Sequence, residues 1–427
     1  MTGLTEYQIP YGHGWLSFNL PEWVNPTLVN PNDIPGAANP YTLVEDALLH
    51  PVGEVDLKAF HDVGSVAIAI SDKTRPVPHR QVLPPLLEYL KKLGIPEQAF
   101  QFYIGTGTHP VMAAGELSAI LPVEILSRYK VLCHQCDDQE ALTNLGRTSR
   151  GTPVWVNKQY AQADLRIVVG MIEPHQFQGF SGGVKGAAIG LAGRLTINHN
   201  HSMMSEEGSR LGCYERNPAR QDVEEIGEII GVHFALNVIL NYRKEIVRVI
   251  AGQPREVMVK GVLISREINQ VQVEQLFDLV IASPGGHPKD INVYQAQKAL
   301  AHATLMTRAG GSVILAAACP EGIGSRGHEE FMSRVNSHQE VIDIFQEEGF
   351  QVGAHKALQI AQAANNVRIF LVSDMPSEEV RGLLLTPMED INQAISKVSA
   401  DLSPGVRVAV MPRASSTIPQ LVAATSR

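Results

Sequence analysis

Residues 168–201 read VVGMIEPHQFQGFSGGVKGAAIGLAGRLTINHNH, and the rest of the chain is organised around this stretch. Its first residues continue an apolar run, residues 165–170, of the kind that forms a buried strand. The stretch contains three histidines, one lysine and seven glycines. Glycine allows positive φ and a close approach of the backbone to a ligand. Because open α/β sheets bind ligands beyond the carboxyl ends of their strands, the stretch predicts a site there for a nucleotide-like cofactor and a metal.

The size and charge of the chain set broad limits on its class. Its 427 residues exceed what one hydrophobic core usually supports, so we expect two domains. The apolar share of 44% and the charged share of 19% are those of an ordinary globular protein. The net charge of −9 argues against nucleic acid or an anionic membrane as a partner. A small anionic substrate would therefore need local Lys or Arg side chains.

The compartment and the cysteines are read from the same sequence. No apolar run reaches the roughly 18–20 residues of a membrane-spanning helix, and the first residues, MTGLTEYQIPYGHGW, lack the pattern of a signal peptide. We therefore expect a cytoplasmic protein. Four cysteines in so long a chain do not make a disulfide framework. Cys133 and Cys136 have CxxC spacing, but with no second pair a strand-edge position is preferred to zinc or redox chemistry.

Three short apolar runs, residues 65–70, 100–104 and 165–170, each end in a loop of polar or ionisable side chains. The first two of these loops read SDKTRP at 71–76 and GTGTHP at 105–110. Strand, loop, helix and strand in succession is the pattern of a doubly wound parallel sheet. Loops that leave one edge of a sheet converge on one crevice, although any single loop could instead be a capped turn.

The predicted fold is two α/β domains with mainly parallel sheets and an active site in the cleft between them. Residues 1–265 are expected to form the first domain, which carries the cofactor and catalytic loops and begins with an irregular lead-in that contains an edge strand or a hairpin. A connecting segment near 253–272 leads to the second domain, residues 273–400, on the substrate side. Residues 405–427 are expected to return to the first domain.

Four histidines are candidates for chemistry. His109 and His175 each lie one loop-length beyond a predicted strand end, where side chains with a pKa near neutrality suit reversible proton transfer. A helix cap or a bond to a carbonyl is the alternative for either one alone. His199 and His201 are two positions apart and would point the same way on an extended segment. One could then bind a metal while the other orients it, unless both face solvent.

Lys185 lies in the sequence GGVKGAA. It could bind a phosphate, although the spacing is not the GxxxxGK[ST] of a P-loop, or anchor a cofactor covalently through its amine. A solvated loop lysine is the alternative.

Two further polar clusters could bind anions. The first follows the first strand, where backbone N–H groups, a hydroxyl and a guanidinium can hold a phosphate or a carboxylate. Its residues are Asp72, Lys73, Thr74 and Arg75. The second lies on a predicted helix and can present an ammonium and an amide to a small carboxylate, or simply face solvent. Its residues are Tyr294, Gln295 and Lys298.

Taken together, these segments resemble the nickel-pincer lactate racemase family over nearly the whole chain. The matching motifs are SDKTRP at 71–76, GTGTH at 105–109, EPHxFQGFSGGxKG at 173–186, Asn200–His201–Ser202, NPxRxDxxEIG at 217–227 and YQAQK at 294–298. The resemblance implies nickel held by pyridinium-3,5-bisthiocarboxylic acid mononucleotide. Lys185 would match the lysine that carries this cofactor covalently, and His201 the protein ligand of the nickel. His109 and His175 would match the two acid/base histidines.

The resemblance also implies partners for the remaining candidates. Asp72, Lys73, Thr74 and Arg75 would hold the cofactor, and Arg75, Tyr294, Gln295 and Lys298 would contact the substrate. That substrate would be a small anionic 2-hydroxy acid, and dedicated maturation enzymes would have to supply the cofactor. The sequence sets no oligomeric state.

The implied reaction inverts C2 of a 2-hydroxy acid by reversible hydride transfer through a 2-keto acid. Residues 354–358, AHKAL, lack the aromatic residue sought there as a contact for lactate, so a larger 2-hydroxy acid such as a sugar acid is also considered. A nicotinamide-type dehydrogenase is an alternative. Against it, we expect that the chain has no GxGxxG loop between a strand and a helix with an acidic residue about 20 positions further on. The other alternative is a protein that carries nickel or a nucleotide without catalysing a reaction.

Overall fold

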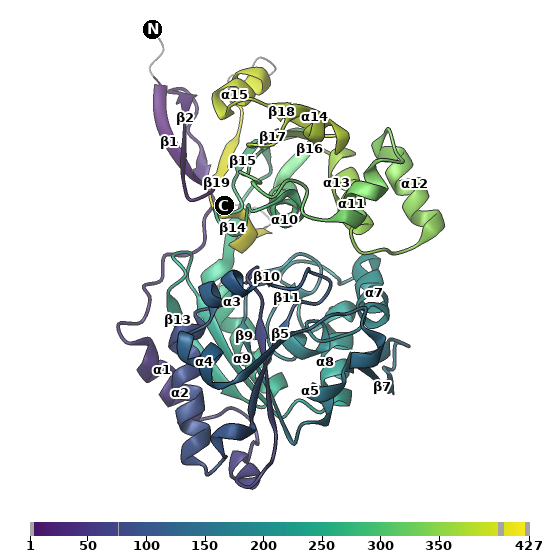
Figure 1. Ribbon diagram of the computed structural model, residues 1–427. Helices are drawn as coiled ribbons and strands as arrows, with labels where there is room; N and C mark the ends of the chain where they lie inside the picture. The colour runs from purple at the N-terminus through teal and green to yellow at the C-terminus, as the bar shows by residue number, and fades with distance from the viewer. Residues whose placement is uncertain (1–3, 76, 400–404, 423–427) are drawn as a thin grey trace. The chain divides into compact units, whose positions relative to one another are not determined.

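The structure, a computed structural model, describes all residues except 1–3, 76, 400–404 and 423–427. It separates the chain into two compact units (Figure 1). The central unit comprises Asp33–Ile268, and the terminal unit comprises Met1–Asn32 together with Asn269–Arg427. Each unit has a six-stranded sheet and is a mixture of helices and strands, which confirms the predicted class of two α/β domains with mainly parallel sheets.

The sheet of the central unit has the strand order β13-β12-β9-β4-β5-β6. Strand β4 (Val66–Ser71) pairs in parallel with β5 (Phe100–Gly105) on one side and with β9 (Leu165–Met171) on the other. The three predicted polar loops therefore leave the same edge of the sheet. Chain order reverses between β4 and β9, which is the position where open α/β sheets bind ligands.

The core of the central unit explains why these strands form. All five residues from Val66 to Ile70 are buried, the continuous run expected of a strand inside a parallel sheet. One face of the sheet packs against the apolar stripe of α2 (His79–Lys92), from Val82 to Leu90. This stripe has the 3.6-residue period of an amphipathic helix.

The other elements of the central unit follow in chain order. They are α1 (Pro40–Leu49), α3 (Ala114–Ile120), α4 (Val123–Arg128), β6 (Lys130–Cys133), β7 (Leu142–Arg147), β8 (Pro153–Asn157), α5 (Lys158–Gln162), β10 (Pro174–His175), β11 (Gly179–Phe180), α6 (Lys185–Ala188), α7 (Arg194–Ser202), α8 (Pro218–Ile230), β12 (Phe234–Leu240), β13 (Ile246–Gly252) and α9 (Pro254–Asn269). Helix α9 replaces the connecting segment expected near 253–272. Its buried residues Val257, Met258 and Val262 share one face of the helix, and this short stripe was too sparse to stand out in the sequence.

The terminal unit has the strand order β18-β17-β16-β15-β19-β3, with every neighbouring pair parallel. Its elements are β1 (Leu4–Tyr11), β2 (Gly14–Pro21), β3 (Thr27–Leu28), β14 (Gln270–Val273), β15 (Phe277–Ala282), α10 (Val293–Thr304), β16 (Thr307–Ala316), α11 (Arg326–Met332), α12 (His338–Glu348), α13 (Ala354–Ala364), β17 (Arg368–Val372), α14 (Ser377–Gly382), β18 (Thr386–Met388), α15 (Ile391–Ser399), β19 (Val408–Met411) and β20 (Ile418–Leu421). Of the edge strand or hairpin expected at the start of the chain, the structure has the hairpin, formed by β1 and β2.

Both ends of the chain belong to this unit, as the purple β1 and β2 and the yellow β19 show in Figure 1. Strand β19 pairs with β15 and with β3. The prediction that residues 405–427 return to the first domain is therefore wrong for the described part of that range, and residues 1–32 also lie outside the unit assigned to them. All four residues of β19 are buried, so the strand needs a neighbour on each side, but its apolar pattern does not say which strands these are.

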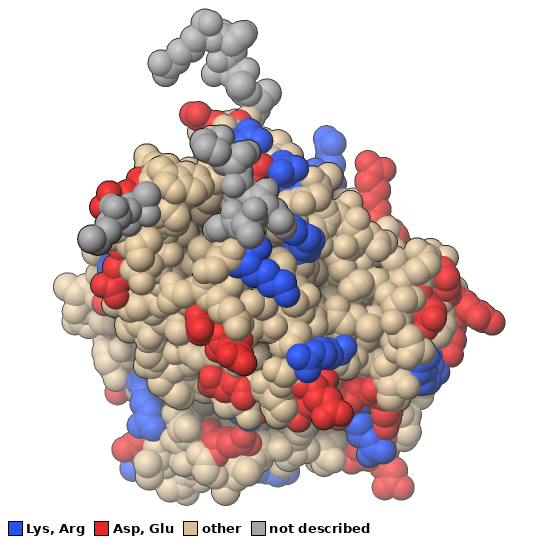
Figure 2. All heavy atoms as spheres, turned by 90° about the horizontal axis from the view of Figure 1, so that it is seen from above, with Lys and Arg blue, Asp and Glu red and all other residues tan. Residues whose placement is uncertain are grey.

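Charged side chains of both signs are interspersed on the face seen in Figure 2. Among the described residues drawn there, no continuous basic stripe of the kind found on nucleic-acid-binding faces is visible. Within the described part of the chain, none of the helices combines the length and the apolar character needed to cross a bilayer.

Candidate catalytic site

The three polar loops at the carboxyl edge of the central sheet are joined by direct contacts. His109, which follows β5, lies with its Nδ1 2.6 Å from Oδ2 of Asp72, which follows β4. Arg75 belongs to the β4 loop, and its Nη1 lies 3.4 Å from Oε1 of Glu173, which follows β9. One hydrogen bond and one ion pair therefore bring together loops that begin more than thirty positions apart.

The Asp72 carboxylate is buried and charged. Its Oδ1 accepts hydrogen bonds from the backbone N–H and the hydroxyl of Thr74, at 3.1 and 2.6 Å. Burial alone raises the pKa of Asp72, but the charge and hydrogen bond of His109, with smaller effects from Thr74 and Arg75, lower this pKa to about 2. Asp72 is therefore a carboxylate throughout the neutral pH range.

The contact with Asp72 determines which nitrogen of His109 carries the proton. An ionised carboxylate can only accept hydrogen bonds, so Nδ1 of His109 must be the donor. In the neutral ring the lone pair then lies on Nε2, which is the nitrogen that can take up a proton. A buried carboxylate that orients an imidazole in this way is the arrangement of a general base.

His175 has a different environment. It lies on β10, which pairs with β11, and its buried ring makes an edge-to-face contact with Phe177 at 4.9 Å between centroids. The backbone N–H of Gln178 donates to Nδ1 of His175 over 3.3 Å. Because Nδ1 is an acceptor here, the neutral ring carries its proton on Nε2. The two histidines are thus held in opposite tautomers.

The backbone around Lys185 packs against the loop that ends in His109. Lys185 is half-buried and opens the short helix α6. The N–H of Gly107 donates to the carbonyl of Gly190 at 2.9 Å. A Cβ added at Gly105 would lie 2.9 Å from the Gly186 carbonyl oxygen, too close for any real side chain. Glycine at this position therefore lets the two segments approach.

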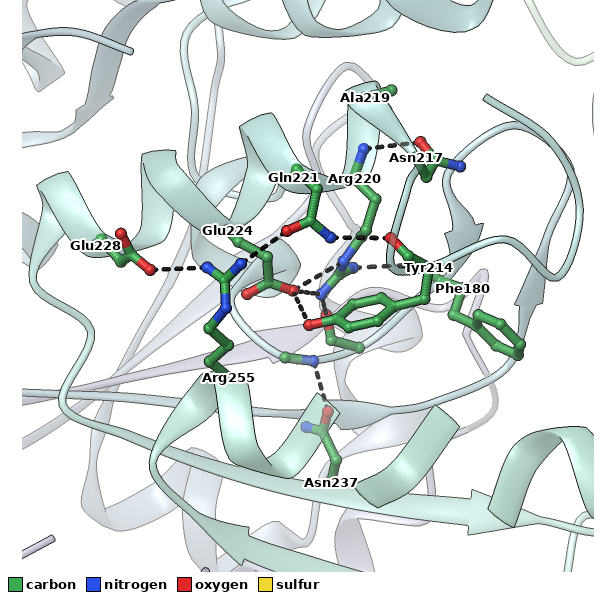
Figure 3. A network of polar contacts seen from close by, with 12 residues as sticks. Phe180, Tyr214, Asn217, Ala219, Arg220, Gln221, Glu224, Glu228, Asn237 and Arg255 are labelled. Atoms are coloured by element: carbon green, nitrogen blue, oxygen red, sulfur yellow. Dashed lines mark hydrogen bonds and ion pairs between the residues drawn. The ribbon is translucent and has the colours of Figure 1, made fainter. Parts of the chain in front are cut away.

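A buried ion pair on α8 holds the glycine loop, residues 179–184, which precedes Lys185 (Figure 3). Asn217 directly precedes helix α8 and is its N-cap, because its side chain accepts from the backbone N–H of Arg220. The Arg220 guanidinium lies 2.6 Å from Glu224 Oε1, and both side chains are almost fully buried. It also donates to the carbonyls of Phe180, at 3.2 Å, and Gly182, at 3.1 Å. Arg220 therefore connects this helix to the backbone of the loop.

Two further side chains bind to the ion pair and to the glycine loop (Figure 3). The Tyr214 hydroxyl donates to Glu224 Oε1 at 3.1 Å, and Asn237 on β12 accepts from the Gly183 N–H at 2.6 Å. The sequence motif at 217–227 contributed to the resemblance but no role was assigned to its residues. An arginine and a glutamate four positions apart, with apolar Val223 between them, were the signal that could have found the pair.

His199 and His201 lie on helix α7, so the expectation that they share a direction on an extended segment is wrong. Residues two apart on a helix are rotated by about 200° and point to different sides. The centroid of the His201 ring lies 5.0 Å from that of Phe177, which also contacts His175. His199 instead lies with Nδ1 2.8 Å from the hydroxyl of Thr152. His201 is thus the one that shares an aromatic neighbour with an acid/base candidate.

Other polar candidates have partners of their own. The Lys73 ammonium lies 2.6 Å from a carboxylate oxygen of Glu116, on α3. The thiols of Cys133 and Cys136 form no disulfide, and burial raises the pKa of Cys136 to about 11, so it is not a reactive thiolate. No group of three or more His, Cys, Asp or Glu suited to a metal ion occurs among the described residues.

The predicted substrate-side residues belong to the terminal unit, on α10. Tyr294 and Lys298 are half-buried and Gln295 is buried, with its side-chain oxygen 2.5 Å from the Lys298 ammonium. Helix α13 packs its His355 ring edge-on to Tyr294 at 5.9 Å and its Lys356 ammonium 5.1 Å from the same ring. Residues 354–358 therefore place an imidazole and an ammonium beside Tyr294, in the stretch where an aromatic residue was sought.

A GxGxxG spacing does occur between a strand and a helix, contrary to expectation. Residues 322–327 read GIGSRG, follow β16 and include the first two residues of α11. The loop begins six residues beyond the end of β16, and its backbone carbonyls at Gly322 and Ile323 accept from the first two N–H groups of α10, at 3.0 and 3.1 Å. In a dinucleotide site the glycines follow the strand directly, so this loop does not have that geometry.

Comparison with known proteins assigns both halves of the chain. The family model described as the lactate racemase N-terminal domain matches residues 11–212, and that of the lactate racemase C-terminal domain matches residues 272–418. The lactate racemase of Thermoanaerobacterium thermosaccharolyticum is 28% identical over 424 residues, which cover 97% of this chain and 99% of the relative. That of Lactiplantibacillus plantarum is 30% identical over 303 residues, covering 70% of this chain and 71% of the relative.

Solved structures agree with these matches. The lactate racemase apoprotein from T. thermosaccharolyticum superposes with a TM-score of 0.90 at 28% identity, over 97% of this chain and 100% of the other. A protein from Thermotoga maritima shares the fold, with a TM-score of 0.71 at 18% identity over 91% of this chain and 100% of the other. With both family models matched in order along the sequence, the chain belongs to the lactate racemase family of isomerases.

Proposed function

We propose that this racemase inverts C2 of a 2-hydroxy acid with nickel held by pyridinium-3,5-bisthiocarboxylic acid mononucleotide. The observation that carries the proposal is the Asp72–His109 pair, which lies at the sheet edge where the β4, β5 and β9 loops meet. The relatives are lactate racemases, which makes lactate the first substrate to test.

The residues of the central unit fit such a cofactor. Lys185 would hold the nucleotide through its amine, and His201 would bind the nickel through its imidazole. Because the described residues contain no group of three or more metal-binding side chains, nickel bound by His201 would need further ligands from the cofactor itself. A pincer nucleotide brings such ligands, so one protein histidine is sufficient.

The chemistry divides between cofactor and chain. When bound, the cofactor would supply a reversible acceptor for the hydrogen on C2, which leaves as hydride and gives a planar 2-keto acid. The task of the chain is to move the hydroxyl proton. Nε2 of His109 would take that proton while Asp72 keeps the ring oriented. His175 would serve the opposite face. As hydrogen returns to C2 there, the His175 ring would give a proton to the substrate oxygen, and the proton that His109 took up would replace it before the next turnover, so that no proton is gained or lost overall.

The polar segment 72–75 would have a divided role. Asp72 and Thr74 bond to each other and so steady His109, whereas Lys73 is paired with Glu116. Arg75, held by Glu173, would be the residue of this segment that meets the anionic cofactor or the substrate carboxylate. Tyr294, Gln295 and Lys298 would contact the substrate from the terminal unit.

The choice of substrate depends on the surroundings of Tyr294. Lactate presents only a methyl group beyond C2, and the polar neighbours His355 and Lys356 do not favour a methyl group over a hydroxylated chain. A larger 2-hydroxy acid, including a sugar acid, is therefore the second candidate.

The test begins with protein loaded with cofactor by its maturation enzymes. Intact mass and metal analysis should show one adduct and one nickel, and the adduct should be absent from Lys185→Ala. Chiral chromatography over a panel of 2-hydroxy acids should then show racemisation, which His109→Ala and His175→Ala should abolish with nickel retained. Turnover of adduct-free protein with NAD would support the dehydrogenase alternative, and a loaded protein inactive on the whole panel would support the carrier.

A further inference from the structure

A chain of buried hydrogen bonds lies behind the site. The Gln178 amide nitrogen donates to Oδ1 of Asn200 at 2.8 Å. The Asn200 amide nitrogen donates to Oδ2 of Asp222 and to the carbonyl of Ala219, both at 2.8 Å. The side chains of Gln178, Asn200 and Asp222 belong to residues with 0% exposure, so each bond is made in a dry interior where a lost partner is not replaced by water.

The far end of this chain is firmly anchored. Asp222 also accepts from the hydroxyl of Thr148 at 2.6 Å and from that of Thr152 at 2.9 Å. Because the Asn200 nitrogen faces two acceptors, its oxygen must face Gln178, and the Gln178 nitrogen must face Asn200. The orientation of both amides therefore follows from the network itself.

Gln178 connects this anchor to the site. Its backbone N–H is the group that donates to Nδ1 of His175, and Asn200 directly precedes His201 on α7. One residue thus bridges the loop that carries His175 and the helix that carries His201. The Phe177 ring makes an edge-to-face contact with each of these two histidine rings.

We propose that Gln178 is a positioning residue for racemisation, which holds the His175 loop against α7 and keeps the His175 proton on Nε2. The proposal rests on the function proposed above. The side-chain bond to Asn200 fixes the place of the Gln178 backbone, and hence the aim of its N–H at Nδ1 of His175. An N–H cannot donate to a nitrogen that already carries a proton, so this contact keeps the tautomer of His175 opposite to that of His109.

The test uses Gln178→Met, which keeps the length of the side chain but removes the amide, and Gln178→Glu, which sets a carboxylate against the Asn200 oxygen. The control is Gln159→Glu, an identical change at an exposed position of α5 in the same unit. Ring nitrogens of ¹⁵N-histidine-labelled, full-length protein without cofactor are observed by NMR, with His175 assigned by its loss in His175→Ala.

We expect the wild type and the control to show the Nε2–H tautomer at His175, and both Gln178 variants to show averaged nitrogen shifts. In loaded enzyme, the variants should lose at least tenfold in kcat, with KM within about threefold and nickel content unchanged. A Gln178→Met protein that melts normally but keeps the wild-type tautomer signal would overturn the proposal, as would a kcat within twofold of wild type. If the wild type racemises none of the 2-hydroxy acids, the proposed function is rejected. The tautomer measurement, which needs no cofactor, still decides whether Gln178 sets the tautomer of His175.

Discussion

Replacing Arg220 by methionine should lower the free energy of unfolding of the central unit by about 3–5 kcal/mol, the usual effect of removing one partner of a buried ion pair. The side chains of Arg220 and Glu224 are 0% and 2% exposed. Without the guanidinium, the Glu224 carboxylate keeps the Tyr214 hydroxyl, and the carbonyls of Phe180 and Gly182 lose a donor. For a unit of this size the change corresponds to a melting temperature lower by roughly 6–20 °C.

The matched control is Arg326→Met. Arg326 and Glu330 also form an ion pair at i and i+4, but their side chains are 89% and 63% exposed. Exposed pairs contribute little to stability, so this variant should melt close to the wild type. Thermal unfolding followed by circular dichroism and calorimetry, on protein without cofactor, measures both variants.

The reasoning would be refuted if Arg220→Met and Arg326→Met were equally stable. A second comparison separates charge from packing. Replacing both Arg220 and Glu224 by apolar residues should recover much of the loss, because no buried charge is then left without its partner. Both Arg220 variants should still form less Lys185 adduct during maturation, because the carbonyls of the glycine loop remain without the guanidinium.

Three further predictions follow from single residues. Asp72→Asn should lower the free energy of unfolding by about 2 kcal/mol at neutral pH, because the folded protein lowers the pKa of Asp72 to about 2. In urea unfolding, this difference from the wild type should vanish as the pH falls from about 4 towards 2, where the Asp72 carboxylate becomes protonated. His201→Ala should lose nickel by metal analysis and keep the lysine adduct, and unchanged nickel would move the assignment to His199. Gly182→Ala should destabilise the protein by more than about 1 kcal/mol in thermal unfolding, because φ is +99° and the new Cβ would lie 2.6 Å from a neighbouring side-chain carbon. The control is Gly115→Ala in α3, where the new Cβ would meet nothing within 4 Å, and it should be neutral or stabilising in the same measurement.

Much of the fold can be read from local patterns. The run that became β4 is continuous and apolar, which is typical of a strand buried on both faces, and those that became β5 and β9 are interrupted only by Gln101 and Arg166. Parallel strands send their following loops to one edge, so the convergence of three polar loops could be predicted without knowing the strand order. The amphipathic helix α2 was equally visible, and the hairpin of β1 and β2 was one of two alternatives for the start of the chain.

The errors came where a pattern has more than one solution. Strand β19 is apolar on both faces, and such a strand fits any sheet with space for it. The residues around His199 and His201 carry a weak apolar pattern, so helix and extended chain were not separated until the contacts of α7 decided between them. The GxGxxG spacing at 322–327 shows the converse, since a motif without its structural context does not make a site.

By itself, the sequence determined the α/β class with two units, the edge at which chemistry could occur, and the histidines, lysine and acidic residues available there. Only the tertiary structure decided that Asp72 meets His109 across 37 positions, that Arg220 reaches carbonyls 40 and 38 positions away, and that His175 is held in the tautomer opposite to that of His109. The physical reason is that periodicity and turn chemistry act between near neighbours in the chain. Buried polar contacts depend instead on which distant segments the packed core brings within hydrogen-bond distance.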